Sequence, residues 1–178
     1  MRIFLWPYIY TLTDTNLEIR LSKDLTDSFM IQDHPQHQGI TLNITVLGTN
    51  LWRLNPPTPT FVIPTEVETT YLRFQKYYQM KHPDRKLTWL WNYSKNELRT
   101  NYLGRNYIMM TSSYQMAVLL QYNKNDRLSL DEIQAATGIP NDILSQVLAL
   151  LVKAKVLINE EKDHYYDLNT STFIEKCS

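Results

Sequence analysis

The sequence predicts an α+β fold, with a mixed or antiparallel sheet and a packed helix followed by a winged-helix domain. Apolar and polar residues alternate over residues 40–46 and again over 87–93, which is the period of half-buried strands. From Ser112 onward the apolar residues recur at helical spacing in three successive segments. We therefore expect three units: an atypical N-terminal piece over 1–35, a sheet domain over 36–111 and a winged helix over 112–178.

Composition narrows the class of protein. The chain has 178 residues, of which 43% are hydrophobic and 20% charged, so a packed core is expected rather than disorder. Lysine plus arginine balance aspartate plus glutamate at 18 each, which provides no global field to hold a nucleic acid or an anionic membrane. Cys177 is the only cysteine, so neither an intramolecular disulfide nor a cysteine-based zinc site is expected.

The compartment is expected to be reducing, either cytoplasmic or nuclear. The apolar run at the N-terminus is interrupted by Pro7 and is followed by no small-residue cleavage pattern, so we do not expect a signal peptide. No stretch approaches the ~20 apolar residues that cross a bilayer.

The first elements follow from spacing. Leu21, Leu25 and Phe29 fall on one face of a short helix predicted over 21–29. His34 and His37 lie in a segment predicted as an exposed polar loop rather than a metal site, because two histidines without a nearby third ligand do not make a metal site. Residues 40–46 are predicted as a strand, and the four prolines between residues 55 and 64 predict an extended connection.

A longer helix is predicted to begin at Thr65, with Glu68 completing a capping box, and to end at His82 before Pro83. Its apolar stripe is Val67, Tyr71, Phe74 and Tyr78. A strand is predicted next, with Leu87, Trp89, Trp91 and Tyr93 on one face, and it ends in a turn at 94–96. A third strand follows through Leu98, Thr100 and Tyr102, and after a turn at Gly104 a fourth strand is predicted over 107–111.

The last unit follows the order of a winged helix. Capping boxes pair Ser112 with Gln115 and Ser129 with Glu132, and Gly138 ends the second helix. A third helix is predicted over 141–155, and residues 156–158 and 165–168 then pair as a hairpin. The helix residues predicted to point inward are Met116, Leu119, Leu120, Leu144, Val147, Leu148 and Leu151.

A winged helix raises the question of DNA binding. The exposed positions predicted on the third helix include Asp142, Lys153 and Lys155 but no arginine, and specific base reading usually needs arginine and several phosphate contacts. An enzyme is expected even less, because the chain has no Gly-rich phosphate loop, zinc-binding His-Glu helix or nucleophile elbow. We expect no catalytic residue, cofactor or metal.

Two motifs resemble the cullins, the elongated scaffolds of modular ubiquitin ligases. Arg85, Lys86, Leu87, Thr88 and Trp89 match that family's RKLTW signature, and the run from Tyr114 to Leu120 matches its next block. The resemblance extends over residues 21–176, and it implies that 1–35 includes the end of a helical bundle. Residues 101–104, NYLG, lean toward the branch that works through elongin adaptors.

The resemblance implies a non-catalytic scaffold of a cullin-RING ubiquitin ligase that supports ubiquitin-dependent protein degradation. A RING-box protein would donate a strand to the sheet by β-augmentation and bring its own zinc. The resemblance implies a platform for that strand at Ile40, Leu42, Ile44, Val46, Trp89 and Trp91. The family's substrate-adaptor region and the lysine that receives its ubiquitin-like modifier are not found in this sequence, so the chain is expected to be a fragment or truncated paralogue that is not modified. The alternative is a winged-helix module for protein or DNA binding, unrelated to ubiquitin.

Overall fold

The computed structural model describes residues 4–9, 16–33, 40, 42, 44, 46, 61–87, 89–100, 107–160 and 164–169. Helices and short antiparallel strands alternate over these residues, which confirms the predicted α+β class. The elements are, in order, β1 (Phe4–Ile9), α1 (Asn16–Asp33), α2 (Thr65–Lys81), the 3-10 turn η2 (Trp91–Tyr93), β2 (Ser94–Thr100), β3 (Tyr107–Ser112), α3 (Ser113–Gln121), β4 (Arg127–Ser129), α4 (Leu130–Thr137), α5 (Asn141–Lys153), β5 (Leu157–Glu160) and β6 (Tyr165–Leu168).

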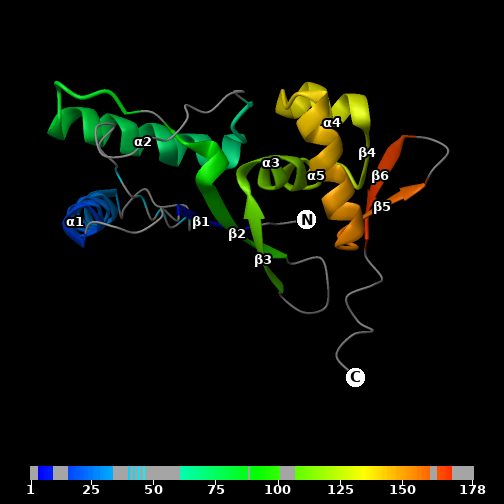
Figure 1. Cartoon of the computed structure of the whole chain (residues 1–178), viewed down its shortest axis with the longest axis horizontal. Helices are drawn as coiled ribbons and strands as arrows, with labels where there is room; N and C mark the ends of the chain where they lie inside the picture. The colour runs from blue at the N-terminus through cyan, green and yellow to red at the C-terminus, as the bar shows by residue number, and fades with distance from the viewer. Residues whose placement is uncertain are drawn as a thin grey trace.

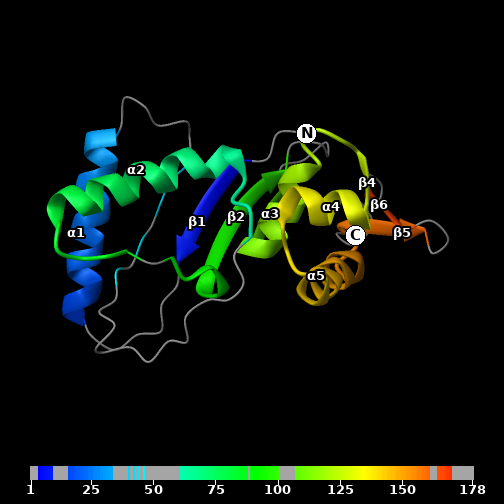
Figure 2. The same cartoon turned by 90° about the horizontal axis from the view of Figure 1, so that it is seen from above.

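The described strands form two antiparallel sheets. The first has the order β1-β2-β3 and the second has the order β4-β6-β5. Helices α1 and α2 lie at one end of the molecule, the first sheet lies in the middle, and α3, α4, α5 and the second sheet lie at the other end (Figure 1). Seen from above, β1 and β2 run side by side between α2 and α3 (Figure 2).

Helix α1 is longer than the predicted helix over 21–29, and it packs on α2. The ring of Phe29 lies 5.3 Å from that of Phe74 in an edge-to-face arrangement and 5.5 Å from that of Tyr77. Aromatic pairs favour this geometry, and all three side chains are buried. A helix that cannot stand alone thus gains its stability from α2.

Helix α2 has the predicted bounds, and its four predicted stripe residues are buried. The predicted capping box at its start is wrong. Thr65 is the first helical residue rather than the N-cap, and the N-cap residue, Pro64, has no side-chain acceptor for a capping hydrogen bond. Proline suits this place because its fixed φ, here −57°, fits the entry into a helix and it has no N–H to satisfy.

Residues 87–93 do not form the predicted strand. Residues 91–93 form the turn η2, and Ser94 to Asn96, predicted as a turn, begin β2 instead. Alternation of apolar residues reports which side chains are buried, and here the burial comes from packing on α2 rather than from strand pairing. Strand β3 lies where the fourth strand was predicted, and residues 101–106, with the predicted turn at Gly104, lie outside the described residues.

The second half agrees closely with its prediction. Both capping boxes are present, at Ser112 with Gln115 and at Ser129 with Glu132. Gly138 ends α4 with a φ of +63°, which is accessible to glycine without a Cβ penalty. Helix α5 ends two residues earlier than predicted, because Lys155 adopts a left-handed φ of +58° and turns the chain into β5. All seven helix residues predicted to point inward are buried.

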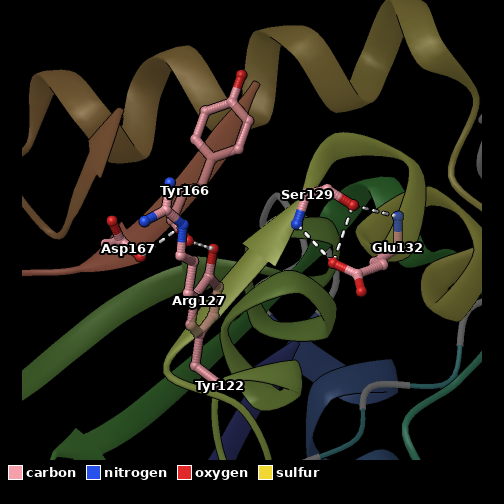
Figure 3. A network of polar contacts seen from close by, with 6 residues as sticks. All are labelled: Tyr122, Arg127, Ser129, Glu132, Tyr166 and Asp167. Carbon is pink, nitrogen blue, oxygen red and sulfur yellow. Dashed lines mark hydrogen bonds and ion pairs between the residues drawn. The ribbon is translucent and has the colours of Figure 1, made fainter. Parts of the chain in front are cut away.

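A polar network joins the end of α3 to the second sheet (Figure 3). The Tyr122 hydroxyl donates to the backbone oxygen of Tyr166 at 3.1 Å, and Arg127 pairs with Asp167 at 3.8 Å. Burial, together with the negative charge of Asp167, raises the pKa of Tyr122 well above its usual value. The Tyr122 hydrogen bond therefore ties β6 to the end of α3, and the Arg127–Asp167 pair joins β4 to β6.

Candidate partner-binding surface

The predicted platform residues from the 40–46 segment point into the protein. Ile40, Leu42 and Ile44 are buried and Val46 is partly buried against the same core. The Thr26 hydroxyl of α1 donates to the backbone oxygen of Ile44 at 3.0 Å, which ties this segment to α1. None of these four residues belongs to a strand, and residues 41, 43 and 45 lie outside the described part. The alternation was a correct sign of burial, but the strand was not found at the residues that the structure describes.

Trp89 and Trp91 lie in an aromatic cluster on α2. Their rings stack at 5.6 Å with an interplanar angle of 22°, and Tyr71 meets both edge-to-face at 4.9 and 5.0 Å. Phe61 adds a further edge contact to Trp91 at 5.5 Å. Trp91 is 9% exposed and Trp89 is half-buried, so this cluster serves mainly to hold residues 61 and 89–91 against α2.

The solvent face of the first sheet carries apolar residues that sequence reasoning missed. On β3, Ile108 and Met110 are 60% and 52% exposed. They stand opposite Arg99 and Glu97 of β2 in the strand register. The signal that could have found them is the continuous apolar run from residue 107 to residue 110, because a strand directs successive side chains to opposite faces and so places apolar residues on both faces of the sheet.

The inner face of β2 is anchored to α3. Asn96, Leu98 and Thr100 are buried, and the Asn96 amide nitrogen donates to the Ser113 hydroxyl at 3.4 Å. Because β2 is held on this face and paired with β3, it forms a stable template along its other edge. That edge is occupied by β1, from Phe4 opposite Arg99 to Ile9 opposite Ser94.

The described residues show no arrangement typical of a metal centre, since no group of three or more His, Cys, Asp or Glu side chains could hold an ion there. Two tyrosine hydroxyls, those of Tyr71 and Tyr122, have strongly raised pKa values because burial disfavours the phenolate. The pKa of Glu132 is lowered by its hydrogen bonds to the backbone and side chain of Ser129. These shifts report packing and helix capping.

Among the described helices, no single one is long and apolar enough to cross a membrane. Helices α4 and α5 pass that test only when taken together, and they are bent by 117° where they meet. Four residues of α5 and two of α4 are buried inside the protein.

The fold and surface define an α+β domain with edge strands and exposed apolar residues suited to contacts with other proteins. Residues 46–176 match the family model of the cullin alpha+beta domain. The chain belongs to the cullin family. It is 35% identical over 157 residues to cullin-1 of Schizosaccharomyces pombe and 38% identical over 147 residues to cullin-1 of Dictyostelium discoideum, which are 86% and 79% of this chain. It is also 34% identical over 148 residues, 81% of the chain, to cullin-3A of Arabidopsis thaliana.

The matches cover only 20%, 19% and 20% of these three relatives, so the chain spans about a fifth of their length. The family likeness inferred from Arg85–Trp89 and from Tyr114 to Leu120 is thereby confirmed. The resemblance of residues 101–104 to the elongin-linked cullin branch stays a prediction. The division into units at residues 35 and 111 also stays a prediction. Strand β1 and helix α1 both lie before the matched range of 46–176.

Proposed function

We propose that this chain acts as a non-catalytic scaffold in a cullin-RING ubiquitin ligase, in which it binds a RING-box protein and supports ubiquitin transfer and ubiquitin-dependent degradation. The observation that carries the proposal is the match to the cullin alpha+beta domain over residues 46–176. The sheet with an anchored central strand and the exposed apolar residues Ile108 and Met110 support it, because both suit a contact with another protein.

The contact we propose is strand addition. Main-chain groups at a sheet edge supply affinity for an extended segment, and side chains on alternate positions supply specificity. The side chains of Ile40, Leu42 and Ile44 are buried in this chain, so any part that this segment plays would be through its backbone. Backbone pairing is also compatible with a net charge of zero, because it does not depend on a strong field of one sign.

We further propose that α3 to α5 and the second sheet form a winged helix that makes protein contacts. The outward residues of α5 include Asn141, Asp142, Ser145 and Lys153, with no arginine in the helix, and the apolar Leu150 is 54% exposed. Such a surface offers one lysine where phosphate binding needs several cations, and it offers an apolar residue to a protein partner. The DNA-binding alternative therefore has less support than the scaffold.

Mixing the full chain with a zinc-loaded RING-box protein tests this proposal. We expect a 1:1 complex by size-exclusion chromatography with light scattering, and a dissociation constant that changes little between 50 and 300 mM salt. A RING-box protein without its strand-donating segment is the matched control and should not bind. Addition of a ubiquitin-charged conjugating enzyme then reports whether the complex speeds ubiquitin discharge.

The proposal would be contradicted if the chain, shown to be folded by circular dichroism, formed no complex at tens of micromolar. Ile44→Asp is a poor binding variant, because Ile44 is 3% exposed and a buried unpaired charge would unfold its surroundings. Ile108→Asp is better suited, since Ile108 lies in solvent. A loss of binding in a folded Ile108→Asp protein would assign the outer face of the first sheet to the interface.

A further inference from the structure

Strand β1 is the part of the first sheet that the family match does not include. The matched range, 46–176, supplies β2 and β3, whereas residues 4–9 supply the third strand. Without β1, the main-chain groups along one edge of β2 would have no partner in the described part of the sheet. An edge of this kind is a template for pairing with another extended chain.

The direction of the main-chain groups of β2 follows from two contacts with β3. The Thr111 hydroxyl donates to the backbone oxygen of Asn96 at 3.2 Å, and the backbone N–H of Tyr107 donates to the Thr100 hydroxyl at 3.3 Å. The backbone oxygen of Asn96 therefore points at β3. The N–H of Tyr107 points at β2, and directly opposite residues of an antiparallel pair either face each other or both face away, so the main chain of Thr100 also faces β3. Because successive residues of a strand direct their N–H and C=O groups to opposite sides, Lys95, Glu97 and Arg99 face β1.

The same alternation explains the proline in β1. Pro7 stands opposite Asn96, whose main chain faces away from β1, so the nitrogen of Pro7 points away from β2. Proline therefore removes no bond from the β1–β2 ladder, and it leaves the outer edge of β1 without a donor at that point. Proline on an edge strand is a known way of stopping further strand addition. β1 thus both fills the edge of β2 and closes the sheet.

We propose that the edge of β2 at Lys95, Glu97 and Arg99 is a strand-acceptor site that β1 occupies within the same chain, and that a RING-box protein must displace β1 to add its own strand there. This inference rests on the proposed function, since it assigns the donated strand to that edge. Two strands cannot pair with the same groups at once. The apparent affinity for the partner is therefore reduced by the fraction of molecules in which β1 has left the edge.

Two proline variants of the full chain distinguish pairing from other effects of residues 4–9. Trp6 stands opposite Glu97, so its N–H faces β2, and Trp6→Pro removes a ladder bond. Leu5 stands opposite Leu98 and has the same orientation as Pro7, so Leu5→Pro removes only an outward N–H. Both substitutions add one proline to the same strand, which makes Leu5→Pro the matched control.

Hydrogen exchange of the isolated proteins is the first measurement. We expect Trp6→Pro to speed amide exchange at Lys95, Glu97 and Arg99 at least about tenfold relative to Leu5→Pro, because opened amides exchange with solvent. Exchange at Asn96 and Leu98, which pair with β3, should change little and reports that the sheet remains folded. Equal exchange in the two variants would overturn the assignment of β1 to this edge.

Binding of two probes is the second measurement. A labelled peptide with the sequence of residues 1–12, MRIFLWPYIYTL, should bind Trp6→Pro about tenfold more tightly than Leu5→Pro, and a RING-box protein should show the same preference and displace the peptide. If the RING-box protein binds both variants equally and leaves the peptide in place, the inference is wrong and the proposed function stands. If it binds neither variant while the peptide binds, the proposed function fails and the RING-box part of the inference falls with it.

Discussion

Gly138 ends α4 beside Val62, a residue of the first half of the chain, so its replacement by alanine is a sensitive test of the structure. Gly138 ends α4 with a φ of +63°, a left-handed conformation that side chains other than glycine and asparagine adopt with strain. A Cβ at this position would lie 3.2 Å from the Val62 Cγ2 atom, closer than an ordinary van der Waals contact. The Val62 N–H donates to the backbone oxygen of Thr137 at 2.7 Å, so the segment at residue 62 is held against the end of α4.

We expect Gly138→Ala to lower the free energy of unfolding by about 1–2 kcal/mol. The left-handed φ contributes about 1–3 kcal/mol of strain, and the reduced freedom of the unfolded chain offsets about 0.4–1 kcal/mol of it. The contact with Val62 adds little if its exposed side chain can turn aside. For a protein of this size the melting temperature should fall by about 2–8 °C.

Thermal and urea unfolding of the parent and four variants separate these contributions. Gly138→Asn tolerates the left-handed φ but is larger than alanine, so it should be less damaging than Gly138→Ala if backbone strain dominates. Val62→Ala removes the contacted methyl groups, and the double variant with Gly138→Ala should then show additive losses. The reasoning is refuted if Gly138→Ala is as stable as the parent, or if Val62→Ala fully restores it, since the second result would make the contact rather than φ the cause.

Further expectations follow from individual side chains in the structure. The Tyr71 hydroxyl is buried without a hydrogen-bond partner, so Tyr71→Phe should be neutral or should stabilise the protein by up to about 1 kcal/mol in urea melts. The Tyr122 hydroxyl donates to the backbone oxygen of Tyr166, so Tyr122→Phe should destabilise the protein by about 1 kcal/mol. Both pKa values are raised in the folded state because burial disfavours the phenolate, so the folded protein loses stability as pH rises above the unfolded pKa near 10. Tyr71→Phe should therefore unfold less readily than the parent at alkaline pH. Ser129→Ala should cost about 1 kcal/mol through loss of the α4 cap, measured against Ser145→Ala, whose exposed hydroxyl bonds only to the preceding turn at Asn141. The lowered pKa of Glu132 means that its contribution is present above the unfolded pKa and lost as pH falls through the folded value, so the parent should lose stability more steeply than Glu132→Gln in acid. Selection with random oligonucleotides should enrich no motif, and enrichment that disappears in Lys153→Glu with Lys155→Glu would overturn the protein-contact role proposed for α5.

The second half of the chain was largely predictable, because its signals are local. A capping box needs two side chains three residues apart, and both boxes predicted at Ser112 and Ser129 form. The left-handed end at Gly138 depends on one residue's freedom, and the inward face of α5 depends on helical spacing alone. The tertiary contacts of α3, α4 and α5 are consistent with these local preferences and did not override them.

The candidate site was harder to predict, because strand pairing depends on partners far away in the sequence. Alternation correctly marked Ile44 and Trp91 as inward-facing, but the same pattern arises when a segment lies on a helix without pairing. The pairing of residues 4–9 with β2, more than eighty residues later, left no local trace beyond an apolar run containing Pro7. The continuous apolar run over residues 107–110 predicts apolar side chains on both faces of a strand, but the exposure of Ile108 and Met110 depended on what covered β3.

The sequence by itself determined the α+β class, the bounds of α2, the capping of α3 and α4, and the motifs shared with cullins, because each of these depends on residues close together in the chain or on their order. Only the tertiary structure decided that α1 packs on α2 through Phe29, that Tyr71 meets both tryptophans edge-to-face, and that β1 completes the first sheet. The physical reason is that burial and backbone pairing are satisfied jointly by segments distant in sequence. Several segments of similar composition compete for each edge and face, and only the folded chain selects among them.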